Sequence, residues 1–142
     1  MSESVSFLHP ERLGTSGGMF SPGVKVTEPA STLFIAGQIS AGADGSTVGE
    51  GDFAAQVRQV FHNIGVVLDA GGMGFCDIVK FTTFIVGQQH VPTFVETRGE
   101  IFPELFGVGP YPTNTLIVID RLARPQFLVE IEAVAMQGAR TD

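Results

Sequence analysis

The clearest pattern along the chain is an apolar stripe at helical spacing between residues 52 and 70. Its members would share one side of a helix and lie on a core: Phe53, Val57, Val60, Phe61, Ile64 and Leu68. Asp52 precedes the stripe, and its carboxylate can accept from the free N–H groups of a first helical turn. Gly71-Gly72 follows it and supplies a stop. The sequence therefore predicts an amphipathic helix from Asp52 to Ala70.

The next segment, Ile78 to Val86, is rich in β-branched and aromatic residues and predicts a strand. Simple alternation divides its apolar residues between the two faces, with Val79, Phe81 and Ile85 on one and Ile78, Phe84 and Val86 on the other. One face can be covered by helices. The other needs a different cover, for which the sheet of a neighbouring subunit is the natural candidate.

Further elements surround this helix and strand. Short strands are predicted at Gly23 to Thr27 and Thr32 to Ile39, and a second helix near Pro92, which Pro103 should disturb. Two strands follow, Asn114 to Asp120 and Phe127 to Met136. The order of two or three strands, helix, strand, helix and two strands predicts an α+β fold with helices on one face of a sheet. Without repeats or linkers, residues 1–142 are expected to form one domain.

Composition narrows the class of protein. Of 142 residues, 44% are hydrophobic and only 16% charged, which favours subunit association over a merely apolar monomer. A net charge of −7 without a basic run argues against a nucleic-acid partner. The N-terminus lacks a signal-peptide pattern, and no apolar stretch is long enough to span a membrane. We therefore expect a cytoplasmic protein.

Several common sites lack support in the sequence. The three histidines are widely separated, so no metal site is expected. Neither a dinucleotide-binding nor a P-loop glycine motif occurs, and no cofactor is expected. Cys76, the single cysteine, cannot form an internal disulfide and has no identifiable base beside it. We interpret it as a structural or incidental thiol.

One polar constellation lies in the last third of the chain. Glu130 and Glu132 alternate with apolar residues, so both carboxylates should point to one face of the final strand. A polar segment, Pro112 to Thr115, lies where a loop enters the preceding strand. Two interpretations remain open. The glutamates line a hydrated sheet face, or one of them positions a water molecule in a cleft.

Taken together, these features resemble the RidA/YjgF family of reactive-intermediate deaminases. No single stretch is specific, but the series keeps the family's order and spacing from about Ser21 to Ala135. The matching stretches are Phe20-Ser-Pro-Gly-Val24, Leu33-Phe-Ile-Ala-Gly-Gln-Ile39, the helix from Gln56 through Asn63 to Gly72, Asp77-Ile-Val-Lys80, and Pro112 through Val129-Glu-Ile-Glu-Ala-Val-Ala135.

The resemblance implies a fold like that of Bacillus chorismate mutase. This fold is a single layer of mixed β-sheet with two helices on one face, and three copies assemble into a homotrimer with a barrel-like centre. It also implies three clefts at subunit interfaces for small-molecule ligands. In active family members these clefts hydrolyse enamines and imines to a 2-keto acid and ammonia.

The chain departs from the family at the substrate's carboxylate. Active members carry an arginine two positions after a proline, whereas here Asn114 follows Pro112. A charge-assisted hydrogen bond contributes about 1.5–3 kcal/mol against about 1 for a neutral one. A family tyrosine falls at Phe20, so a hydroxyl is also absent. The resemblance nevertheless retains Glu132, thought to position the hydrolytic water, and Gly37, whose backbone approaches the ligand.

The resemblance favours a hydrolytic deaminase, or a related C–N hydrolase, of a small enamine or imine. In this hypothesis Glu132 activates water and Asn114 fixes a substrate carbonyl or amide, with weak or no affinity for small imino acids. The alternative is a non-catalytic trimer that binds a small ligand. RNA cleavage is a third hypothesis, disfavoured by the acidic charge. The sequence leaves open whether Arg121 or Arg124 replaces the missing charge.

Overall fold

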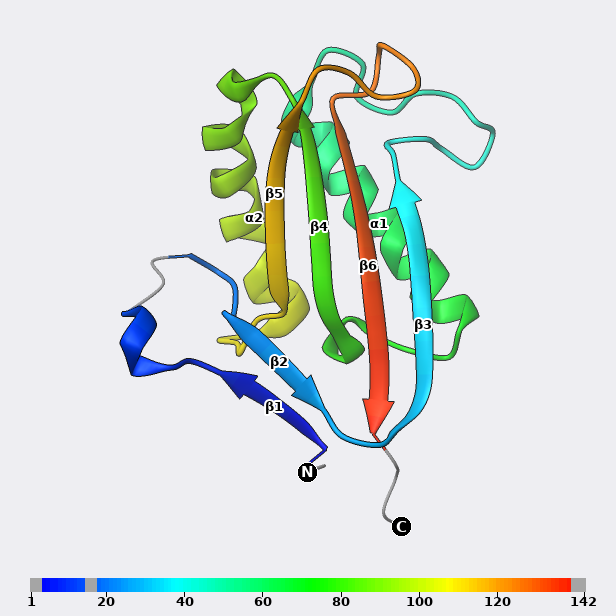
Figure 1. Ribbon diagram of the computed structural model, residues 1–142. Coiled ribbons are helices and arrows are strands. Elements are labelled where there is room, and N and C mark those ends of the chain that lie inside the picture. Colours follow the sequence, from blue (N-terminus) through cyan, green and yellow to red (C-terminus); the bar gives the residue numbers. More distant parts are fainter. Residues whose placement is uncertain (1–3, 15–17, 139–142) are drawn as a thin grey trace.

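The computed structural model describes residues 4–14 and 18–138. Eight main elements follow one another along the chain: β1 (Val5–Leu8), β2 (Gly23–Val26), β3 (Pro29–Gln38), α1 (Phe53–Ala70), β4 (Ile78–Val86), α2 (Val91–Phe106), β5 (Thr113–Ile119) and β6 (Val129–Gly138). The order agrees with the α+β arrangement predicted from the sequence, and α1 and β4 agree closely with the predicted ranges (Figure 1).

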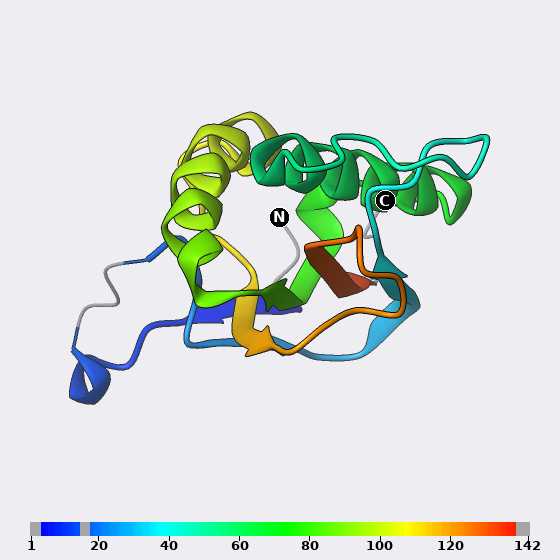
Figure 2. The same cartoon turned by 90° about the horizontal axis from the view of Figure 1, so that it is seen from above.

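The main sheet has four strands in the order β3-β6-β4-β5. β6 is antiparallel to both β3 and β4, whereas β4 and β5 run parallel, so the sheet is mixed. Seen from above, α1 and α2 lie together on one face of the sheet, which confirms the predicted layer (Figure 2). β1 and β2 form a separate two-stranded sheet.

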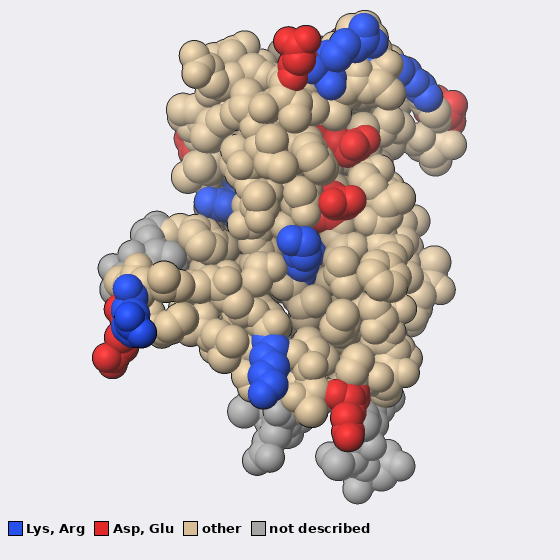
Figure 3. Space-filling model, viewed as in Figure 1, with Lys and Arg blue, Asp and Glu red and all other residues tan. Residues whose placement is uncertain are grey.

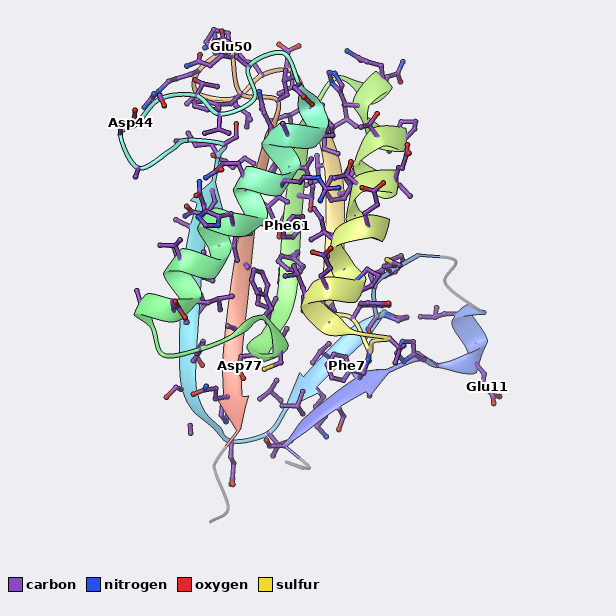
Figure 4. All side chains as sticks on the ribbon, turned by 180° about the vertical axis from the view of Figure 1, so that it is seen from behind. Phe7, Glu11, Asp44, Glu50, Phe61 and Asp77 are labelled. Atoms are coloured by element: carbon purple, nitrogen blue, oxygen red, sulfur yellow. The ribbon has the colours of Figure 1, made fainter. Side chains whose placement is uncertain are left out.

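The core fills the space between the helices and the sheet. Asp52 caps α1 as predicted, because its side chain accepts a hydrogen bond from the Ala55 amide at 3.1 Å. The apolar stripe of α1, which includes Phe61 (Figure 4), is buried. The ring of Phe61 meets the rings of Phe81 and Phe102 edge to face, each at 5.7 Å between centroids. This aromatic contact joins α1, α2 and β4.

The predicted alternation in β4 is wrong at Ile78. Ile78 pairs with Ala135 of β6, but Lys80 already pairs with Val134, so β4 contains one extra residue at this point. Such a bulge reverses the facing of the residues before it. Ile78 is therefore buried in the core with Phe81, instead of lying on the opposite face.

Pro103 does not end α2, which continues to Phe106. The proline lies in the last turn, where its missing N–H costs the helix one backbone hydrogen bond, the one to the carbonyl of residue 99. Phe106 then packs edge to face on Phe102 at 4.9 Å and on Phe81 at 6.2 Å between centroids. These contacts hold the final turn on the core.

The face of the sheet opposite the helices is uncovered in the single chain. Phe34 on β3 is 77% exposed and Ile117 on β5 is 41% exposed. Figure 3 shows this face, on which only scattered charged groups interrupt an otherwise uncharged surface. We call it the open sheet face below.

Candidate functional site

Glu132 lies on the open sheet face. The residues that alternate with Glu130 and Glu132 on β6 are buried on the helix side, as predicted. Glu132 pairs with Thr82 of β4, and both residues line a hollow of about 440 Å³. The other residues that line the hollow come from strands β3, β4 and β6: Phe34, Ile35, Ala36, Lys80, Ala133 and Val134. An exposed carboxylate therefore lies in a hollow with an amine and mainly apolar walls.

Gly37 lies on the neighbouring edge strand, against Glu130. Ile35 pairs with Ala133 and Gln38 with Ile131, so β3 bulges at Ala36-Gly37. A Cβ atom at Gly37 would come within 2.7 Å of the Glu130 carboxyl carbon. The absence of a side chain thus lets the Glu130 carboxylate lie directly against the β3 backbone. Gly37 and the two glutamates consequently share one region of the open sheet face.

Asn114 lies on the helix side of the sheet. Its amide oxygen accepts a hydrogen bond of 2.8 Å from the hydroxyl of Thr83, a buried residue of β4. The strand register explains the position, because Asn114 pairs with Phe81 whereas Glu132 pairs with Thr82. Adjacent residues of a strand point to opposite faces. One chain therefore does not bring Asn114 and Glu132 into a common cleft.

Phe20 belongs to the same corner of the molecule as Asn114. The next residue, Ser21, is buried and fixed to the loop before β5, since its amide donates to Pro112 at 3.1 Å and its hydroxyl to Tyr111 at 2.5 Å. These bonds hold the segment containing Phe20 beside the beginning of β5. The four residues predicted for the site thus fall into two groups, Phe20 with Asn114 and Gly37 with Glu132.

A buried cation, Arg98, lies near the group formed by Phe20 and Asn114. Arg98 of α2 is only 7% exposed, and its guanidinium lies over the rings of Phe94 and Phe102 at 5.4 and 5.9 Å. Among the described residues its Nε has no hydrogen-bond partner. Burial lowers the pKa of the Arg98 guanidinium.

The surroundings of Arg98 do not balance its charge. A cation–π contact contributes about 0.5–2 kcal/mol, whereas the effective penalty for burying an ion is several kcal/mol. Within the described part of the chain, the one ion pair joins Arg58 to Glu100 and does not involve Arg98. The sequence contained a signal for this residue, because Phe94, Arg98 and Phe102 repeat every four positions and place the arginine on the buried side of α2.

The segment between β5 and β6, which carries Arg121 and Arg124, follows the end of β5 opposite to Asn114 (Figure 1). Seven positions of extended strand separate Asn114 from Arg121, about 23 Å at 3.3 Å per residue. Arg121 donates to the backbone oxygens of Leu122 and Ala123, and Arg124 lies over the ring of Phe127. Neither arginine lies near Asn114 within its own chain.

Other reactive groups give no sign of a second site. Burial, with a smaller contribution from Asp77, raises the pKa of the Cys76 thiol, which disfavours the reactive thiolate. His90 stacks on Phe53 at 4.7 Å between ring centroids. Across residues 4–14 and 18–138, no group of three or more His, Cys, Asp or Glu side chains could hold a metal ion. In the same residues, no helix combines the length and apolarity needed to cross a membrane.

Comparison with known proteins identifies relatives along nearly the whole chain. The family model described as "Endoribonuclease L-PSP" matches residues 14–137. A RutC family protein of Pyrococcus horikoshii is 32% identical over 118 residues, covering 83% of this chain and 86% of that protein. TdcF of Escherichia coli, provisionally named a reactive intermediate deaminase, is 30% identical over 122 residues, covering 86% and 92%.

Solved structures extend the similarity to the fold. YyfB of Yersinia pestis, a protein of unknown function from the conserved Rid family, superposes with a TM-score of 0.83 at 31% identity. That comparison covers 94% of this chain and 98% of YyfB. The structure of E. coli TdcF with bound serine has a TM-score of 0.68 at 26% identity and covers 94% and 99% of the two chains.

Proposed function

The chain belongs to the RidA/YjgF family, and we propose that it is a hydrolytic deaminase, or a related C–N hydrolase, of a small enamine or imine. The observation that carries the proposal is the exposed Glu132 carboxylate in an otherwise largely apolar hollow on an uncovered sheet face. An apolar hollow with few polar groups is typical of a small-molecule site.

In the proposed reaction Glu132 holds a water molecule and accepts one of its protons. The water oxygen forms a bond to the imine carbon, and the nitrogen takes up a proton. As the resulting carbinolamine collapses, its hydroxyl loses a proton, its nitrogen gains one, and the C–N bond breaks to release ammonia and a carbonyl product. An enamine first gains a proton at carbon and then follows the same route. Overall, one water is consumed and no oxidant or metal is required.

The proposed assembly is a trimer like that of Bacillus chorismate mutase, with the open sheet faces packed around its centre. The exposed Phe34 and Ile117 favour a covered face, because large apolar side chains are stabilised when removed from water. In a trimer, Asn114 of one subunit can also lie beside Glu132 of a neighbouring subunit, although the two are on opposite faces of one sheet. We propose that each site takes Phe20 and Asn114 from one subunit and Gly37 and Glu132 from its neighbour.

A binding trimer without catalysis is the second candidate. It is favoured by Asn114, which lacks the charge and the two-pronged hydrogen bonding of the family arginine. TdcF, the relative whose structure contains serine, illustrates a small ligand bound to this fold. RNA cleavage, suggested by the family model's description, fits poorly with a net charge of −7 and 15 acidic against 8 basic residues.

Glu132→Gln distinguishes the two candidates, because it removes the base while keeping the side chain's shape. We expect the native chain to release ammonia from 2-iminobutanoate, generated in situ, faster than buffer does. Glu132→Gln should lower this excess rate by about 10²- to 10⁴-fold, and Glu96→Gln, an exposed change on α2, should not. An excess rate that survives Glu132→Gln would reject the proposed chemistry, whereas ligand binding without any native turnover would favour the binding trimer.

A further inference from the structure

We infer that Arg98 supplies the positive charge that binds a carboxylate of the substrate, in place of the arginine missing at position 114. The inference rests on the proposed function and specifies its substrate class as small enamines and imines that carry a carboxylate. It replaces the sequence-based expectation that such acids bind weakly or not at all.

The first support is the state of Arg98 itself. Its side chain is more than nine-tenths buried, and its Nε lies out of contact with solvent without a hydrogen-bond partner among the described residues. Protein structures rarely leave a buried guanidinium without an anion. The rings of Phe94 and Phe102 orient the group but cannot accept its in-plane N–H bonds. A ligand carboxylate would supply both the opposite charge and the missing acceptor.

The second support is the position of Arg98. Its Nη2 lies 3.9 Å from the place of a Cβ atom at Gly18, and that same place lies 2.7 Å from the ring of Phe20. The guanidinium and the Phe20 ring therefore approach Gly18 together. Across the core, Phe102 under Arg98 stacks on Phe81 at 5.9 Å, and Phe81 is the strand partner of Asn114. Arg98 thus lies at the corner that contains the first group of site residues.

The third support is the orientation of Asn114. The Thr83 hydroxyl donates to the amide oxygen of Asn114, so its NH₂ group is the end available to a ligand as a donor. A guanidinium and a neutral amide donor together suit the two oxygens of a carboxylate. In this arrangement the arginine comes from helix α2 and the asparagine from strand β5. The site thus keeps a positive charge, but helix α2 supplies it instead of strand β5.

Direct binding tests the inference without depending on turnover. The probes are 2-oxobutanoate, the stable product expected from 2-iminobutanoate, and its uncharged analogue 2-oxobutanamide, titrated by calorimetry at fixed salt. The native chain should prefer the acid. Arg98→Met should weaken binding of the acid by about tenfold to a hundredfold and leave the amide within about twofold. Arg58→Met, which removes an exposed arginine, should change neither affinity.

Arg98→Lys provides a second variant that keeps a cation in the buried position. It should bind the acid with intermediate affinity, because an ammonium retains the charge and loses the fork. A general structural defect would weaken both probes equally. Thermal melting shows whether Arg98→Met and Arg98→Lys fold. If one of them does not, the binding data of the other test the role of Arg98.

The outcomes separate this inference from the proposed function. Equal affinity of the native chain for acid and amide, or an unchanged preference in Arg98→Met, would overturn the role of Arg98 even if ammonia release is observed. Conversely, a native chain that binds the acid through Arg98 but shows no ammonia release would reject the deaminase and leave the carboxylate site standing.

Discussion

Replacing Gln56 with glutamate should make the stability of the protein strongly dependent on pH. Gln56 of α1 is fully buried, and its NH₂ group donates to the backbone oxygens of Gly49 at 3.2 Å and Gln126 at 3.0 Å. Its amide oxygen accepts from the Leu128 amide at 2.9 Å, one residue before β6 begins. The side chain therefore fixes the entry of the strand that carries Glu132.

The magnitude follows from these three hydrogen bonds. Glutamate keeps the shape and the acceptor for Leu128 but places an oxygen opposite two carbonyl oxygens. When protonated it can still donate to one of them, so at low pH the loss is about 1 kcal/mol. Burial and the facing carbonyls raise the folded-state pKa of this carboxyl above its unfolded value of about 4.3. Above that pH the unfolded chain loses its proton first, and the loss of stability grows by about 1.4 kcal/mol per pH unit until the folded-state pKa is reached.

The assay is urea unfolding followed by circular dichroism, since the chain contains no tryptophan. Native protein, Gln56→Glu and the exposed control Gln88→Glu are compared at pH 4.5, 5.5 and 6.5 and at one protein concentration, because association would also contribute to stability. The free-energy difference between Gln56→Glu and native protein should widen across this range, whereas that of Gln88→Glu stays nearly constant. Parallel curves for the two variants would refute the buried bridging role of Gln56.

Two further predictions concern the helix cap and the open sheet face. Asp52→Ala removes the acceptor for the Ala55 amide and should lower the unfolding free energy by about 1 kcal/mol in the same urea assay, and an unchanged value would show that the cap contributes nothing. Phe34→Asp should leave the fold of each chain intact, because Phe34 is 77% exposed, but should dissociate the proposed trimer in sedimentation at micromolar concentration. A variant that stays trimeric would show that this face is not the interface.

The periodic elements could be predicted because their patterns reflect local geometry. The stripe of α1, its Asp52 cap and the shared face of Glu130 and Glu132 follow from spacing alone, and all three are confirmed. The inward turn of Ile78 could not be predicted, because it depends on a bulge that appears only when β4 is aligned with β6. A one-residue shift in register moves the side chains of the preceding residues to the opposite face of the sheet.

The relation between the predicted site residues required the same long-range information. Side-chain alternation within a strand shows which of its own residues share a face. It does not show whether that face is on the same side of the sheet as a given residue of another strand. Only the pairing of Glu132 with Thr82 and of Asn114 with Phe81 places the two on opposite sides. The role of Arg98 required long-range information too, because the spacing of α2 places it on the buried side but does not show which side chains surround it there.

Complementation between two inactive variants tests whether each site combines residues of two subunits. Asn114→Asp places a negative charge where the substrate's carboxylate binds, and Glu132→Gln removes the base, so each variant alone should lack activity. In an equal, random mixture of refolded subunits, about one site in four receives an intact Asn114 from one subunit and an intact Glu132 from its neighbour. We expect the mixture to recover about a quarter of native ammonia release, and a mixture as inactive as its components would refute a site shared between subunits.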